Sequence, residues 1–82
     1  MSYNGYFNWE TWNVCLWFDN EYNLYKEYTS MARREPFTAK TAKEYVTEIF
    51  PNGTPDFKTP PKSSYIDVDW QEVADCFNSC LE

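Results

Sequence analysis

The sequence predicts an all-α protein, a compact bundle of four short helices within one domain that covers residues 1–82. Three observations favour this fold. Apolar side chains recur at helical spacing in four segments, and residues that cap or break helices separate these segments. A chain of this length has room for only one hydrophobic core. Residues 65–68, in which apolar and acidic side chains alternate, have no obvious partner strand, so we expect them to be extended loop.

The first predicted helix covers residues 9–19 and follows an N-terminal arm, residues 1–7. Asn8 is expected to cap it, because its side chain can accept a hydrogen bond from a free backbone N–H group. Glu10 is favoured by the positive end of the helix. Apolar side chains occur on every side of this segment, so the helix is either surrounded by its own fold or presents an aromatic surface to a partner.

The second and third predicted helices are short and lie close together in the sequence. Asn20 is a candidate cap for the second, which ends before Pro36 because the residue preceding a proline disfavours the helical conformation. The third is capped by Thr38 or by Thr41, the latter in a capping box with Glu44. Both helices have an apolar stripe on one side, which is typical of helices that pack on a core.

A long proline-rich stretch separates the third helix from the last. Residues 51–68 contain four of the five prolines and are predicted to form a surface loop. Asp69 starts the last helix as its N-cap, with Glu72 three positions later as in a capping box. Trp9, Trp12 and Trp70 are assigned to the core.

Composition and charge exclude several classes of function. The 13 acidic residues outnumber the 7 basic residues, and the net charge of −6 has the wrong sign for neutralising the phosphates of nucleic acids. Histidine is absent, so the usual general base and the commonest metal ligand are both missing. No stretch approaches the roughly 20 apolar residues that span a membrane. We therefore expect no enzyme activity, no catalytic residues, no cofactor, no metal, no direct binding of nucleic acid and no membrane contact.

The three cysteines, Cys15, Cys76 and Cys80, lack the paired spacing of a secreted disulfide scaffold. Cys76 and Cys80 lie one helical turn apart, a spacing that suits two metal ligands, but a closed zinc site needs a fourth ligand beyond the three thiols. We interpret them as buried small hydrophobic side chains with reduced thiols, and we expect a cytoplasmic protein.

The charges are unevenly distributed along the chain. Residues 1–25 hold three acidic residues and no basic one, and residues 63–82 hold five acidic residues and no basic one. Antiparallel packing of the first and last helices would pool these carboxylates into one negative surface suited to a basic partner, as in mimicry of DNA. The alternative is that the acidic balance serves only to keep a small protein soluble.

Two motifs resemble a family of small proteins carried by bacteriophages and mobile elements, to which no activity is assigned. The first is Asn-Trp-Glu-Thr-Trp-Asn-Val-Cys-Leu-Trp over residues 8–17. The second is the acidic N-terminal part of the last helix, residues 69–74. The resemblance implies an accessory gene that acts on a host component. In size and charge the chain resembles phage inhibitors of restriction or CRISPR enzymes, which is an analogy rather than a matter of chemistry.

These observations together predict a small acidic protein-binding module of phage type, located in the cytoplasm of the host cell. We expect it to inhibit a host defence nuclease complex that has a basic surface, through anti-CRISPR or anti-restriction activity. The alternative is a self-associating structural or regulatory phage protein, a homodimer joined through the far side of the first helix. The predicted contact residues are seven acids and four aromatic anchors: Glu10, Asp19, Glu21, Asp67, Asp69, Glu72 and Asp75, with Tyr3, Tyr6, Trp17 and Phe18.

Overall fold

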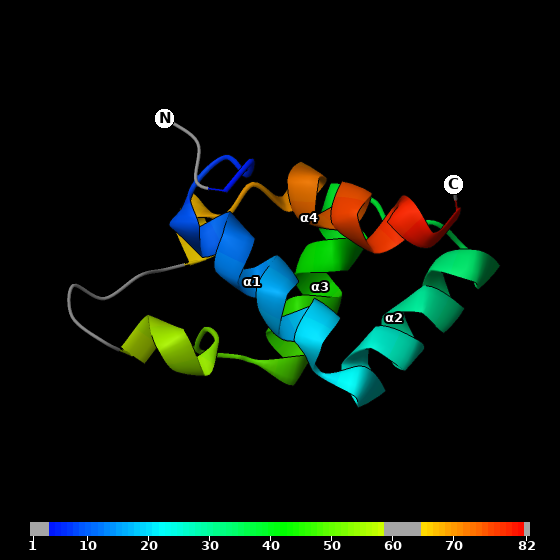
Figure 1. Cartoon of the computed structure of the whole chain (residues 1–82), viewed down its shortest axis with the longest axis horizontal. Helices are drawn as coiled ribbons and strands as arrows, with labels where there is room; N and C mark the ends of the chain where they lie inside the picture. Colours follow the sequence, from blue (N-terminus) through cyan, green and yellow to red (C-terminus); the bar gives the residue numbers. More distant parts are fainter. Residues whose placement is uncertain (1–3, 59–64, 82) are drawn as a thin grey trace.

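Four α-helices form the body of the molecule in the computed structural model, which describes residues 4–58 and 65–81. They are α1 (Trp9–Asn20), α2 (Tyr22–Arg34), α3 (Ala39–Ile49) and α4 (Trp70–Asn78) (Figure 1). Three short 3-10 helices accompany them: η1 (Pro55–Lys58), η2 (Tyr65–Asp67) and η3 (Ser79–Leu81). The described residues contain no β-sheet. The predicted all-α bundle of four short helices is therefore confirmed.

Local capping explains where three of the helices begin. The side chain of Asn8 accepts a hydrogen bond from the backbone N–H of Thr11 at 2.9 Å, which confirms it as the cap of α1. Of the two candidates for α3, Thr38 is the cap, and it forms a reciprocal capping box with Thr41. The predicted box between Thr41 and Glu44 is therefore wrong, because Thr41 already serves as the third residue of the box that opens three residues earlier.

The junction between α1 and α2 lies one residue later than predicted. Asn20 is the last residue of α1, so the prediction that it caps α2 is wrong. Glu21 is the single extended residue between the helices, with φ −89° and ψ 109°, and it makes no side-chain cap hydrogen bond. Its backbone N–H donates to the carbonyl of Trp17, and its own carbonyl accepts from Tyr25. Glu21 is thus both the C-cap of α1 and the N-cap of α2. The predicted end of α2 before Pro36 is confirmed.

The proline-rich segment is more deeply embedded than the prediction of a surface loop over residues 51–68 implied. Thr54 is fully buried and Phe57 is 3% exposed. Gly53 has a φ of +98°, and a Cβ there would lie 2.6 Å from the ring of Phe57, so only glycine fits this turn. Part of the stretch thus completes the core, and residues 59–64 of the predicted loop lie outside the described residues.

The centre of the core is an aromatic cluster around Phe77 of α4. Its ring lies 5.4 Å from Phe18, 4.6 Å from Tyr28, 5.0 Å from Phe37 and 6.0 Å from Tyr45, between ring centroids. These contacts join α4 to the other three helices and to the segment before α3. Because rings bury large apolar areas, this cluster dominates the packing.

The tryptophans assigned to the core lie at its margin instead. Trp9, Trp12 and Trp70 are all half-buried, and Trp9 and Trp70 pack against the core from outside. Phenylalanine and valine fill the fully buried positions, because a tryptophan is rarely buried completely. Trp70 stacks at a tilt on Tyr65, and Trp9 does so on Phe57.

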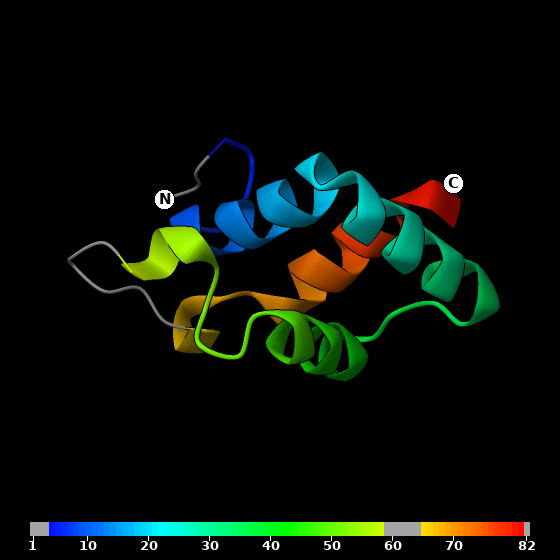
Figure 2. The same ribbon diagram turned by 90° about the horizontal axis from the view of Figure 1, so that it is seen from below.

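The helices α1 and α4 are in contact, as the pooling of the two acidic segments requires, but they run in the same direction and not antiparallel as considered from the sequence. Asn8 and Thr11 at the start of α1 bond to Asp67 and Asp69 at the start of α4. Towards the other end of both helices, the rings of Phe18 and Phe77 meet. In Figure 2 both helices run from left to right. Their positive N-terminal ends are therefore neighbours.

Candidate interaction surface

The N-terminal ends of α1 and α4 are interlocked by hydrogen bonds between their caps. The side-chain amide of Asn8 donates to the carbonyl oxygen of Asp67 at 2.6 Å. The hydroxyl of Thr11 donates to Oδ1 of Asn8 at 2.7 Å, and accepts from the backbone N–H of Asp69 at 2.9 Å. Thr11 is fully buried, so its hydroxyl is a fixed bridge between the two helix starts. This bridge holds the first turns of α1 and α4 next to each other.

The cap of α4 also holds the segment that precedes α1. Asp69 accepts from the backbone N–H of Glu72 at 3.1 Å, which confirms the predicted N-cap. The carboxylate of Glu72, however, accepts from the backbone N–H of Phe7 at 2.7 Å, whereas the N–H of Asp69 donates to Thr11. The capping box predicted between Asp69 and Glu72 is thus half formed, and its second half is replaced by a contact with the N-terminal segment.

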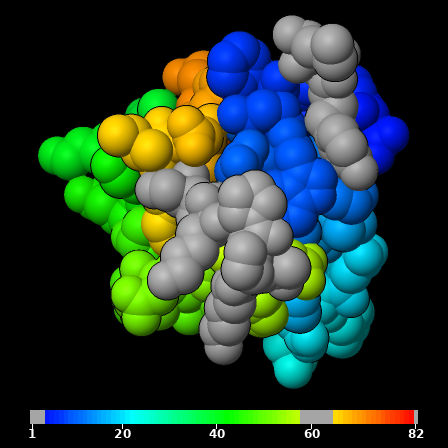
Figure 3. Space-filling view, turned by 90° about the vertical axis from the view of Figure 1, so that its left-hand side faces the viewer, coloured from blue at the N-terminus to red at the C-terminus, as the bar shows by residue number. Residues whose placement is uncertain are grey.

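Four of the predicted contact acids lie in the first turns of α1 and α4 or just before α4, at the two helix ends that these hydrogen bonds join. We call this region the acidic end and define it as Glu10, Asp67, Asp69 and Glu72. In Figure 3 the segment that begins at residue 65 (gold) adjoins the N-terminal segment (blue). Asp67 is exposed and the other three are half-buried. Two positive helix ends oppose these negative charges, which lowers the cost of gathering four carboxylates.

Exposed apolar side chains flank the acidic end, although the sequence analysis did not select them. Phe7 is 59% exposed and Ile66 is 87% exposed. Each is the immediate chain neighbour of one partner in the hydrogen bond between Asn8 and Asp67. Together they add exposed apolar area next to the acidic residues. The sequence signal was weak, because Phe7 precedes a helix and Ile66 lies in a stretch predicted to be extended loop. That prediction is wrong, since Tyr65–Asp67 form the 3-10 helix η2.

The predicted aromatic anchors are mostly unavailable to a partner. Phe18 is fully buried among Tyr45, Phe50 and Phe77, so its assignment as an exposed anchor is wrong. Trp17 is half-buried. Tyr6 is also half-buried, and burial, followed by the nearby thiol of Cys76, raises the pKa of Tyr6 to about 12. Tyr3 lies outside the described residues.

The other predicted acids lie away from the acidic end or have a local role. Asp19 accepts from the hydroxyl of Tyr28 at 2.5 Å, and burial followed by this bond raises the pKa of Tyr28. Asp19 and Glu21 are exposed at the far end of α1, about 18 Å along a helix of 12 residues. Asp75 is exposed on α4 and accepts from Gln71 at 3.0 Å. The predicted set is thus divided between at least two places on the surface.

A polar network on the opposite side of α1 was not foreseen. The side-chain amide of Asn13 and the indole N–H of Trp17 both donate to Oδ2 of Asp56, at 2.7 and 2.9 Å. The hydroxyl of Thr54 donates to Oδ1 of Asn13. These hydrogen bonds hold the pKa of the Asp56 carboxyl below its ordinary value. The network joins the proline-rich segment to α1, and the indole N–H of Trp17 is already used in a hydrogen bond within the fold.

The thiols are arranged for packing. Cys15 is buried, Cys76 and Cys80 are half-buried, and all three are free. A hydrogen bond with Cys76, followed by burial, raises the pKa of the Cys15 thiol. A thiol held in its protonated form is a poor nucleophile and a poor metal ligand. No group of three or more His, Cys, Asp or Glu side chains within residues 4–58 and 65–81 is arranged to hold a metal ion.

Comparison with known proteins assigns the chain to a family. Residues 1–79 match the model of the family of unknown function DUF7249, and the chain belongs to this family. No curated protein and no solved structure shows significant similarity to it. None of the helices in the described part of the chain is both long and apolar enough to cross a membrane.

Proposed function

We propose that this protein is a binding module of phage type that inhibits a host defence nuclease complex, with the acidic end as its contact surface. The observation that supports this function best is the joining of α1 and α4 at their N-terminal ends. The two acidic segments of the sequence meet there, and neither residues 4–25 nor residues 65–81 contribute a lysine or arginine. An excess of negative charge attracts a positively charged partner and speeds its association.

The proposed mechanism is occupancy of a basic channel that otherwise holds nucleic acid. The carboxylates take the place of phosphates, and the exposed side chains of Phe7 and Ile66 supply apolar contact area that DNA lacks at its backbone. The protein acts in this proposal by binding and not by catalysis, and it needs no cofactor. The resemblance of residues 8–17 and 69–74 to phage and mobile-element proteins favours a target in the host cell.

The alternative is self-association through the far side of α1, but fewer apolar side chains are exposed there than the sequence suggested. That seam was to be built on Trp17 and Phe18, and the first is bonded to Asp56 while the second is buried in the core. We therefore place the contact surface at the acidic end.

A plating assay with matched charge reversals tests the function. The protein is produced in bacteria that each carry one restriction or CRISPR system, and the plating efficiency of a sensitive phage is measured. We expect at least a tenfold gain in plaques with one of these systems. Asp67→Lys should abolish the gain, because reversing one charge in a close ionic contact costs about tenfold or more in affinity.

Glu21→Lys is the matched control, since it makes the same change of charge at an exposed site at the other end of α1. It should protect the phage as the unmodified protein does, and thermal melts should show that both variants are folded. Failure to protect against any system contradicts the proposed function. Protection that survives Asp67→Lys contradicts the role of the acidic end.

A further inference from the structure

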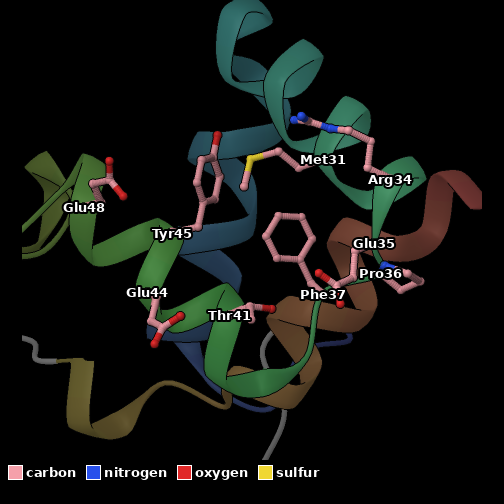
Figure 4. A pocket seen from close by; sticks show the side chains of 9 residues that line it. All are labelled: Met31, Arg34, Glu35, Pro36, Phe37, Thr41, Glu44, Tyr45 and Glu48. Atoms are coloured by element: carbon pink, nitrogen blue, oxygen red, sulfur yellow. The ribbon is translucent and has the colours of Figure 1, made fainter.

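The cleft of about 450 Å³ between α2 and α3 (Figure 4) has exposed carboxylates on its rim and a closed floor. Phe37 and Tyr45 on that floor are only 6% and 7% exposed, because their rings pack on each other and on Phe77. A ligand would therefore find no free ring to stack on. Two exposed Asn-Gly turns, by contrast, are open to a reaction of their own, and the fold treats the two differently.

The Asn-Gly pair occurs twice in the chain, as Asn4-Gly5 and as Asn52-Gly53. Both asparagines are exposed. An asparagine followed by glycine forms a cyclic succinimide readily, because glycine has no Cβ to obstruct its backbone nitrogen and adopts backbone conformations that other residues avoid. By the dipeptide alone, the two pairs are equally reactive.

The turn at Asn52 is fixed by its neighbours. The backbone N–H of Gly53 donates to the carbonyl of Phe50 at 3.3 Å. The ring of Phe57 lies so close that a Cβ on Gly53 would be 2.6 Å from it, and the next residue, Thr54, is fully buried. Before the nitrogen of Gly53 can attack the side chain of Asn52, its N–H must leave Phe50 and this part of the core must open.

The turn at Asn4 is open by comparison. Asn4 and Gly5 are both exposed and have φ values of +50° and +88°, the consecutive positive values of a type I′ turn. A Cβ on Gly5 would meet no atom of the described chain within 4 Å. The described contacts of this segment with the core follow the turn: Tyr6 is half-buried, and the N–H of Phe7 donates to Glu72. The turn can therefore change conformation without disturbing the core.

We propose that Asn4 is a site of spontaneous deamidation and that the fold protects Asn52 from the same reaction. The backbone nitrogen of Gly5 gives up its proton and bonds to Cγ of Asn4. The bond from Cγ to the side-chain nitrogen breaks, and that nitrogen leaves with the proton as ammonia. Water then opens the succinimide at either carbonyl, which yields aspartate or isoaspartate, so water is the only co-reactant.

The reaction turns a neutral amide into a carboxylate. It thus adds one negative charge to the segment whose backbone is bonded to Glu72 of the acidic end. This modification site goes beyond the proposed function and does not depend on it.

Mass spectrometry of the full chain after incubation in a mildly alkaline buffer measures both rates. Trypsin places Asn4 on the peptide of residues 1–26 and Asn52 on that of residues 44–58, and fragmentation assigns the gain in mass to one asparagine. In the folded protein we expect Asn4 to convert at least about tenfold faster than Asn52, because the turn at Asn52 must open first. In urea the two rates should differ by less than about threefold, since unfolding removes the protection.

Asn4→Gln is the matched control, because it keeps an exposed amide whose longer side chain has to close a larger ring. It should abolish the gain in mass at residue 4 and leave the rate at Asn52 unchanged. Equal rates at Asn4 and Asn52 in the folded protein, or no conversion at Asn4, would overturn the proposal. A difference that persists in urea would also overturn it, because the neighbouring residues and not the fold would then set the rates.

Discussion

Replacing Phe77 with alanine is expected to remove a large share of the protein's stability. The ring contacts Phe18, Tyr28, Phe37 and Tyr45, so its removal opens a cavity where all four helices converge. Such a change costs about 3–5 kcal/mol. A chain of this length has a total free energy of unfolding of about 4–12 kcal/mol, so the loss consumes a large share of it.

Urea denaturation followed by tryptophan fluorescence measures this effect. Phe7→Ala is the matched control, because it makes the same substitution at a ring that is 59% exposed, and it should change the free energy of unfolding by about 0.5 kcal/mol or less. If the two variants unfold at the same urea concentration, the aromatic cluster around Phe77 is not the centre of the core.

Replacing Thr11 with valine is expected to loosen the acidic end as well as lower stability. Valine keeps the shape of threonine but removes the hydroxyl that joins Asn8 to Asp69. The backbone N–H of Asp69 then lacks its partner, at a cost of about 1–3 kcal/mol. Amide hydrogen exchange at Asp69 should become faster, and the free energy of unfolding should fall by about 2 kcal/mol.

Thr11→Ser is the informative comparison, because it keeps the hydroxyl and removes one methyl group. It should lose about 1 kcal/mol and keep the exchange protection at Asp69. A valine variant that matches the serine variant in both measurements would show that the bridge between the two helix starts does not hold the acidic end together.

The sequence predicted the local features of this fold and missed those that depend on distant partners. Asn8 and Asp69 were identified as caps and Thr38 was one of two candidates, because an N-cap acts on backbone groups two or three residues away. The contact of Asn13 with Asp56 joins residues 43 positions apart, and no spacing rule points to it. The burial of Thr54 and Phe57 accompanies this contact.

The direction of α1 against α4 and the role of Phe18 could not be predicted for a related reason. Apolar side chains surround α1, so its sequence pattern does not indicate which side faces the core. Phe18 was therefore placed on the surface although it is fully buried. The long connection between α1 and α4 permits either direction of packing. Hydrogen bonds between their caps select the parallel one, and with it the residues that form the acidic end.

The proximity of the two helix starts can be measured directly in solution by nuclear Overhauser contacts in the labelled protein. The bond from Asn8 to the carbonyl of Asp67 predicts cross-peaks between the side-chain amide protons of Asn8 and the Hα of Val68, which lies on the same side of the trans peptide bond as the carbonyl oxygen. Cross-peaks that instead join the first turn of α1 to the last turn of α4 would place Glu10 and Asp67 at opposite ends of the bundle, and would contradict the acidic end as a single surface.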